Sequence, residues 1–172
     1  DTIEQVFLGL KDIGIKWQDL RSKIVFEYYV SYEDKRLVIP IIGRTDIQTP
    51  TALVEIKTKW SRRGAKKKDG THSFSFPKLK DDPEDNHLQQ SSLYYHATKI
   101  PTFIVQATAK DFKVFDIRER DHKSALNQLI VNCTKKQEVA KLDHPEKVIQ
   151  PDFSHYTWNV GEQFLKEAKE LY

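Results

Sequence analysis

Apolar residues recur along the chain with two different periods, and these periods predict where helices and strands lie. In Thr2–Leu10 the apolar positions recur every three or four residues, which is typical of an amphipathic helix. Short runs rich in β-branched and aromatic residues predict strands at Ile24–Tyr32, Pro101–Thr108 and Phe112–Ile117. After these strands, Asp121–Leu142 has the pattern of a long helix.

The middle of the chain predicts two more strands joined by a turn. Val38–Asp46 begins as an apolar run, and Ala52–Thr58 alternates between apolar and polar residues. Between them, Pro50 occupies a position that suits a tight turn. Together with Ile24–Tyr32, these segments predict a three-stranded antiparallel meander.

A second helix follows, and its first residues are typical of a helix N-terminus. In Asp82-Pro83-Glu84-Asp85 an aspartate stands at the expected N-cap, a proline at the first helical position and acids in the first turn. The helix is expected to run to about Thr98. Strands, a helix and more strands in this order predict an α/β fold of the α+β type, with a central mixed β-sheet flanked by helices. Three other segments are expected: a short amphipathic piece at Trp17–Leu20, an irregular stretch at Pro145–Trp158 and a terminal helix at Gly161–Tyr172. Neither the terminal helix nor the helix at Asp121–Leu142 shows candidate chemistry.

Charged residues lie inside the predicted central strands, where burial is costly. Alternation places Glu55 and Lys57 on one face of the second strand and directs Val54 and Ile56 into a core. Asp46, at the end of the preceding strand, is expected to join the two charged residues across the turn. A divalent cation would neutralise the converging carboxylates, and hard cations prefer oxygen ligands. The alternative is a surface ion pair on a two-stranded ribbon, which would stabilise the fold by at most about 1 kcal/mol.

One face of the second helix carries polar side chains that suit contact with a nucleic acid. His87, Gln90 and Tyr94 share this face because they are three and four residues apart. Gln90 can donate and accept hydrogen bonds, and Tyr94 carries a hydroxyl on a flat apolar ring. The alternative is that Tyr94 belongs to the core and Gln90 faces solvent.

Positive charge is concentrated in one segment, although the net charge of the whole chain is only +3. Between Lys57 and Lys80 there are nine Lys or Arg residues and one acid, Asp69. Within it, Trp60–Lys80 shows no period and is expected to be a loop. Its basic part, Arg62–Lys68, is expected to be mobile without DNA and ordered with it, and its alternating end, Ser73–Pro77, is expected to dock the loop. Beside a pair of carboxylates, such a loop suits a phosphodiester substrate. The alternative is a loop that is merely solvated.

Length and composition predict one globular domain over residues 1–172, with a core over about 1–120 and a helical part over about 121–172. No apolar run is long enough to span a bilayer, so no membrane contact is expected. A lone cysteine, Cys133, excludes an intramolecular disulfide and favours a reducing intracellular compartment, such as the cytoplasm of a bacterium or phage-infected host, or an organelle matrix. Because the chain begins at Asp1 and has no methionine, we interpret it as a fragment or a processed form.

Three short motifs together resemble the PD-(D/E)XK nuclease superfamily. Two of them are Gly43-Arg44-Thr45-Asp46 and Val54-Glu55-Ile56-Lys57-Thr58-Lys59, in the order of the superfamily's acidic strands. The third, Gln90-Ser91-Ser92-Leu93-Tyr94, is similar to the Gln-x-x-x-Tyr motif of the RecB-like branch, which includes phage λ-type exonucleases, Cas4 nucleases and the mitochondrial genome maintenance exonuclease. The resemblance covers about residues 1–120 and implies a restriction-endonuclease-like core.

The resemblance implies a metal centre and a catalytic lysine. Asp46 and Glu55 would bind Mg²⁺ or Mn²⁺, with the backbone carbonyl of Ile56 as a further ligand, and Lys57 would position the attacking water. RecB-like nucleases often carry His-x-x-x-Glu on their first helix, and Glu4 is the candidate for that glutamate.

The resemblance also implies a substrate-binding face. Gln90 and Tyr94 would touch the DNA backbone beside the metal, with His87 on the same face. Glu27, inside the first predicted strand, is interpreted as a structural or supporting residue. The phosphate-binding candidates are the bases of the loop: Arg62, Arg63, Lys66, Lys67 and Lys68.

Taken together, the residues and the resemblance predict a Mg²⁺- or Mn²⁺-dependent deoxyribonuclease. A basic loop near the site favours an exonuclease acting on single-stranded DNA or duplex ends, with DNA repair or recombination as its setting. Two alternatives stay open: an endonuclease of the same fold, restriction-like or junction-resolving, and a non-catalytic basic nucleic-acid-binding module. Cleavage polarity, oligomeric state and a preference for DNA over RNA do not follow from the sequence.

Overall fold

The computed structural model describes residues 1–16, 18, 24–144 and 166. Within these ranges no helix combines the length and the apolar character that crossing a membrane requires. The expected helical piece at Trp17–Leu20 lies almost wholly outside the described residues, as do the irregular stretch at Pro145–Trp158 and nearly all of the terminal helix. The elements in chain order are α1 (Thr2–Asp12), β1 (Val25–Tyr32), β2 (Ile41–Gln48), β3 (Leu53–Thr58), β4 (Arg62–Lys66), β5 (His72–Ser75), α2 (Asp85–Thr98), β6 (Thr102–Ala107), β7 (Phe112–Asp116), a 3-10 turn (Ile117–Glu119) and α3 (His122–Ala140).

Five strands form a mixed sheet in the order β1-β2-β3-β6-β7, which confirms the predicted fold class. The first three strands are the expected antiparallel meander. β3 then pairs with β6 in parallel, and β6 pairs with β7 antiparallel. The return from β3 to a parallel neighbour requires a long crossover, which here contains β4, β5 and α2.

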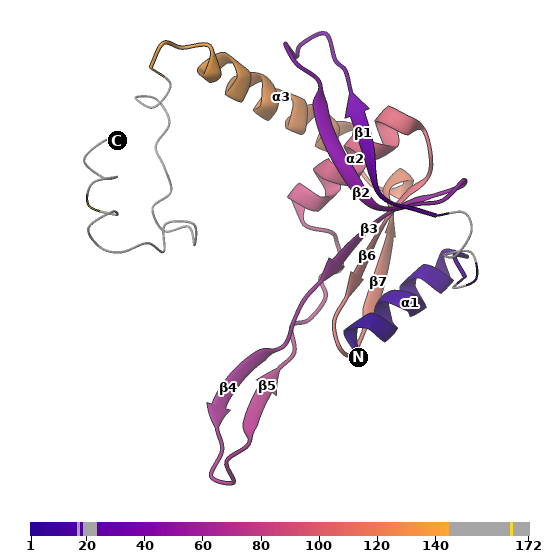
Figure 1. The fold of residues 1–172 in the computed structure, drawn as a ribbon, viewed down its shortest axis with the longest axis vertical. Helices are drawn as coiled ribbons and strands as arrows, with labels where there is room; N and C mark the ends of the chain where they lie inside the picture. The colour runs from indigo at the N-terminus through magenta and orange to yellow at the C-terminus, as the bar shows by residue number, and fades with distance from the viewer. Residues whose placement is uncertain (17, 19–23, 145–165, 167–172) are drawn as a thin grey trace.

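Helices cover both faces of the sheet, so consecutive residues of β3 enter two different cores (Figure 1). Leu53 packs with Leu93 and Tyr94 of α2 and with residues of α3. Val54 points the other way and packs with Leu10 of α1. Burying an aliphatic side chain of this size contributes about 1.5–3 kcal/mol, so each face of β3 is held by its own helix layer. By the same alternation, every second residue after Leu53 faces α2.

The sheet separates into two parts at β2 and β3. These strands are paired only through Ile47 with Val54 and Gln48 with Leu53. Beyond that point β2 continues along β1, while β3 continues along β6 to its end. Figure 1 shows the β1–β2 ribbon leaving on one side and β3, β6 and β7 on the other.

β2 begins later than predicted, at Ile41 rather than Val38. Pro40 has no N–H to give to a ladder, and the side chain of Gln137 on α3 binds the backbone before it instead. Its Oε1 accepts from the N–H of Val38 at 2.7 Å, and its Nε2 donates to the carbonyl of Ile39 at 3.0 Å. The residue that binds the backbone before β2, and so delays the start of the strand, therefore lies about a hundred residues further along the chain.

The prediction of an irregular basic loop at Trp60–Lys80 is wrong, because β4 and β5 form an antiparallel hairpin that projects from the body (Figure 1). We call this hairpin, residues 62–75, the arm. Its turn contains Asp69 and Gly70, a pair typical of hairpin turns, and Gly70 adopts a positive φ of 87°. Asp69 accepts hydrogen bonds from the backbone and hydroxyl of Thr71. The alternation of polar and aromatic residues that begins at Ser73 belongs to β5.

The second helix begins at Asp85, with Glu84 as its N-cap, so the predicted cap at Asp82 is also wrong. Asp82 is drawn instead to Arg120, with 2.7 Å between the charged groups. Glu84 pairs with Lys59 at 2.9 Å. Asp82 and Glu84, which the local pattern assigns to the start of the helix, therefore form ion pairs with residues that are distant in sequence.

Gly43 allows the ring of Tyr94 to lie against β2. A side-chain carbon added at Gly43 would overlap the ring edge of Tyr94, which is fully buried. The position therefore requires glycine for space, because φ there is not positive.

We expect Gly43→Ala to destabilise the fold by about 1–3 kcal/mol, because overpacking a filled core costs this much. Urea unfolding measures the change. Gly64→Ala in the arm is the matched control: there the added carbon meets the hydroxyl of Ser73, the end of a side chain that can rotate away. An unchanged unfolding midpoint for Gly43→Ala would show that the Tyr94 ring is not held against β2.

Candidate active site

β3 presents an acid and a base to α2, as the alternation predicts. Glu55 is only 3% exposed although its side chain carries a carboxyl group. Its Oε1 accepts a hydrogen bond from the Nζ of Lys57 at 2.6 Å. The Lys57 side chain keeps about a quarter of its surface exposed, so the pair lies at the boundary between core and solvent. The alternative of a surface ion pair does not describe Glu55.

Asp46 lies where β2 and β3 separate. Its Oδ2 accepts a hydrogen bond from the backbone N–H of Ile56 at 2.6 Å and so replaces the strand partner that Ile56 lacks there. In an extended strand the N–H and C=O of one residue point to the same side, so the carbonyl of Ile56 also faces β2. Asp46 and Glu55 line one cavity of about 570 Å³, which we call the site cavity.

α2 connects the acids to β2 through two side chains. Gln90 donates from Nε2 to Oε1 of Glu55 at 2.9 Å and to the hydroxyl of Tyr94 at 2.6 Å. The Oε1 of Gln90 accepts from Lys57 at 3.3 Å. The Tyr94 hydroxyl donates to the carbonyl of Arg44 at 2.9 Å. A continuous chain of hydrogen bonds therefore runs from Lys57 to the backbone of β2.

Tyr94 combines the two interpretations that the sequence leaves open. Its ring is 1% exposed and belongs to the core with Leu53 and Leu93. Its hydroxyl belongs to the site, where burial raises the pKa and keeps the group protonated as a donor. Tyr94 is thus linked to Glu55 through hydrogen bonds made by Gln90.

The surroundings of Glu55 disfavour a negative charge on its carboxyl group. Burial raises the pKa of its carboxyl above the ordinary value of 4.5, and the nearby charge of Asp46 raises it further, against the opposing hydrogen bond from Lys57. Its second oxygen, Oε2, is buried and has no hydrogen-bond partner. Such an atom is costly unless something positive meets it. These features fit a divalent metal held by Asp46, Glu55 Oε2 and the carbonyl of Ile56.

The protein side chains alone would not complete a coordination shell. Within the described ranges no group of three or more His, Cys, Asp and Glu side chains is arranged to hold a metal. Mg²⁺ usually keeps several waters and takes one or two carboxylates, so a pair of acids is compatible with it.

His87 lies one turn before Gln90 on α2 and close to the catalytic candidates. Burial and the neighbouring charge of Lys57 lower its pKa, so it is neutral near pH 7. Its Nδ1 is buried without a hydrogen-bond partner. His87 is therefore a neutral imidazole near Lys57, but it is not among the residues that line the site cavity.

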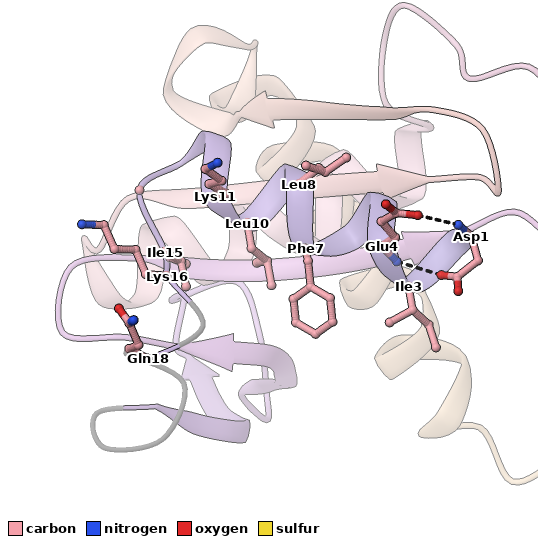
Figure 2. A pocket seen from close by; sticks show the side chains of 11 residues that line it. Asp1, Ile3, Glu4, Phe7, Leu8, Leu10, Lys11, Ile15, Lys16 and Gln18 are labelled. Carbon is pink, nitrogen blue, oxygen red and sulfur yellow. Dashed lines mark hydrogen bonds and ion pairs between the residues drawn. The ribbon is translucent and has the colours of Figure 1, made fainter.

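The structure does not bring Glu4 to Asp46 and Glu55. Glu4 completes a capping box at the start of α1 and pairs with the N-terminal ammonium of Asp1 at 3.0 Å. It lines a separate, largely apolar cavity of about 840 Å³, beside Ile3 and Phe7 (Figure 2). Glu27, by contrast, borders the site cavity and pairs with Arg44 at 2.5 Å.

The phosphate-binding candidates lie on the arm, which begins four residues after β3 ends. Their side chains do not contact the acids, and all five are exposed: Arg62, Arg63, Lys66, Lys67 and Lys68.

Gln106 is a site candidate that the sequence argument missed. It lies beside Lys57 in the β3–β6 register, on the face covered by α2, and is fully buried. Neither its Nε2 nor its Oε1 has a hydrogen-bond partner. A glutamine inside an apolar strand was the available signal, since a buried amide needs partners.

The comparisons with known proteins give no family. No protein-family model and no curated protein matches the sequence. Among solved structures, the protein SSO0001 aligns over 87% of this chain and 68% of its own, with 17% identity and a TM-score of 0.46. A protein from Eubacterium rectale described as a candidate exonuclease aligns over 87% of this chain and 56% of its own, with 16% identity and a TM-score of 0.48. Both TM-scores lie below 0.5, so the interpretation of the site depends on the residues of this chain.

We expect Glu55→Gln to raise the melting temperature in the presence of a chelator. An acid whose pKa is higher in the folded than in the unfolded protein stabilises the fold below its ordinary pKa, and this contribution is lost as the pH rises through the folded value. The advantage of the variant should therefore appear above about pH 4.5 and then level off. Glu138→Gln, on the exposed surface of α3, is the control and should show no such dependence. A destabilised Glu55→Gln protein would mean that the pairing with Lys57 outweighs the cost of burial.

Proposed function

We propose that this protein is a metal-dependent nuclease that hydrolyses phosphodiester bonds in DNA. One observation supports the proposal above the others: a buried glutamate with an unpaired oxygen lies beside an aspartate at the point where the sheet separates. A purely structural acid in this position would be expected to have both oxygens satisfied. The match of this site to the superfamily motifs supports the reaction class.

Mg²⁺ or Mn²⁺, when bound, would activate a water molecule and neutralise charge at the scissile phosphate. Asp46 and Glu55 would hold the ion with the carbonyl of Ile56. Lys57 reaches Oε1 of Glu55 and stands at the solvent boundary, where its ammonium can orient a water and stabilise developing negative charge. Gln90 holds Glu55 in place, so that Oε2 remains directed away from the hydrogen-bond chain.

The arm supports a DNA substrate and favours action near an end. The exposed lysine and arginine side chains of the arm follow β3, which carries Glu55 and Lys57. A DNA strand bound along the arm would therefore lead to the site. We therefore propose an exonuclease, with an endonuclease of the same fold as the alternative.

Digestion of DNA tests this function directly. End-labelled linear DNA and closed circular single-stranded DNA are incubated with Mg²⁺, Mn²⁺ or chelator. We expect the linear DNA to be degraded only with metal and the circle to survive. Cutting of the circle would identify the endonuclease, and no cleavage under any condition would leave only a binding module.

The same assay separates the roles of the charged residues. Asp46→Asn should abolish cleavage through loss of the metal, and Lys57→Ala should abolish it while DNA binding in chelator is retained. Lys141→Ala, which removes a lysine at the far end of α3, is the matched control and should keep full activity. An active Lys57→Ala enzyme would show that the ammonium is not needed at the reaction centre.

Tyr94→Phe tests the hydrogen-bond chain with the least change of shape. The variant keeps the buried ring but removes the group that joins Gln90 to Arg44. We expect a loss of about 1 kcal/mol in stability and a severalfold lower cleavage rate well below the melting temperature. Tyr95→Phe, at the neighbouring position toward His96, should keep the wild-type rate. An unchanged rate in Tyr94→Phe would confine this tyrosine to the core.

A further inference from the structure

The two faces of the arm differ in chemistry. Cross-strand partners lie on the same face of a ribbon, and residues two apart on one strand also share a face. Arg63 is opposite Phe74, and Lys66 is opposite His72. The register shifts between Arg63 and Lys66, so each of them keeps the face of its partner, and Phe74 and His72 are two apart on β5. One face therefore presents these four side chains together, and we call it the aromatic-basic face. The other face carries Arg62 and Ser75, which oppose each other.

Phe74 is exposed without a structural reason. It retains 56% of its surface, whereas a phenyl ring on a two-stranded ribbon normally packs on something. Within the described residues its ring has no aromatic or cation–π partner, even though Arg63 stands opposite it. Phe76 offers a contrast two residues later: its ring lies 4.3 Å from the Nζ of Lys110 and so fastens the base of the arm to the body.

The other side chains of this face leave the ring open. His72 donates from Nδ1 to the carbonyl of Gly64 at 3.1 Å, which fixes its imidazole against the opposite strand. Arg63 and Lys66 are exposed and can reach phosphates on either side of the ring. An exposed aromatic ring between basic side chains matches the pattern by which proteins hold single-stranded nucleic acids, with bases stacked and phosphates neutralised.

We infer that the aromatic-basic face binds single-stranded DNA by stacking an unpaired base on Phe74. In a duplex the faces of the bases are already stacked on their neighbours, so the exposed ring would gain little there. The inference rests on the proposed function for the kind of nucleic acid, and it adds a base-stacking site that the phosphate-binding lysines do not require. It also assigns the two arginines different roles, since only Arg63 shares a face with Phe74.

Fluorescence anisotropy in chelator tests the site without cleavage. The probes are a labelled dT20 strand, a strand of the same length with abasic residues in place of the bases, and a blunt duplex. Phe74→Ala should weaken binding of dT20 by about five- to a hundredfold and leave binding of the abasic strand unchanged. Phe74→Trp should retain affinity for dT20. Phe76→Ala is the apolar control and should have a smaller effect on dT20 than Phe74→Ala.

The arginines give a second, charge-matched comparison. Arg63→Ala should weaken binding of dT20 and of the abasic strand alike, and more than Arg62→Ala does. Equal losses on both strands for Phe74→Ala, no loss at all, or tighter binding of the duplex than of dT20 would each overturn the inference. Phe74-dependent binding without cleavage in any metal would overturn the proposed nuclease alone. Metal-dependent cleavage with a fully competent Phe74→Ala protein would overturn the stacking site alone.

Discussion

The hydrogen bond from the Ile56 N–H to Asp46 is the constraint on which the site depends. It is made where β2 and β3 stop pairing, and it gives a strand amide a side-chain acceptor in place of a backbone one. Without that acceptor the amide would be left unsatisfied at the edge of the core, at a cost of about 1–3 kcal/mol. With it, the sheet can separate, and the carboxylate that permits the separation is held beside Glu55. The opening and its acidic lining are therefore one feature.

The contacts around Glu55 fix the position of its side chain more than they stabilise a negative charge on it. Gln90 and Lys57 share one oxygen of Glu55 and leave the other without a partner. Burial and Asp46 both disfavour ionisation of Glu55, so the arrangement is electrostatically poor in the absence of a cation. The neighbouring structure resists relaxation, because Tyr94 is packed against Gly43 and bonded to the backbone of β2. A local cost maintained by surrounding packing is expected at a functional site.

What the sequence could predict followed from local rules, and what it could not depended on distant partners. Alternation in β3 correctly placed Glu55 and Lys57 on one face, and helical spacing correctly placed Gln90 and Tyr94 together, because both periods are properties of the backbone. The start of β2 could not be predicted, since Gln137 lies far along the chain. The true N-cap of α2 was hidden for the same reason, because Asp82 is bonded to Arg120. The arm is a different case. Its Asp-Gly pair and the alternation after it are local signals of a hairpin, but the high density of basic residues led to the prediction of an irregular loop.

The segments that flank the arm and the buried Glu55 both contact α2 or its N-cap. Glu84 pairs with Lys59, just before the arm, and lies 3.5 Å from the ammonium of Lys80, just after it. One carboxylate thus contacts a lysine from the segment before the arm and a lysine from the segment after it, and the hydrogen bond from Lys59 is the first cause of the lowered pKa of Glu84. Six residues further along the same helix, Gln90 holds Glu55. A helix is a stiff element, and Glu84 and Gln90 belong to the same helix and its N-cap. The same element therefore positions both Lys59 and the buried Glu55. In the nuclease that we propose, this helix would help to position a DNA strand bound on the arm relative to Glu55.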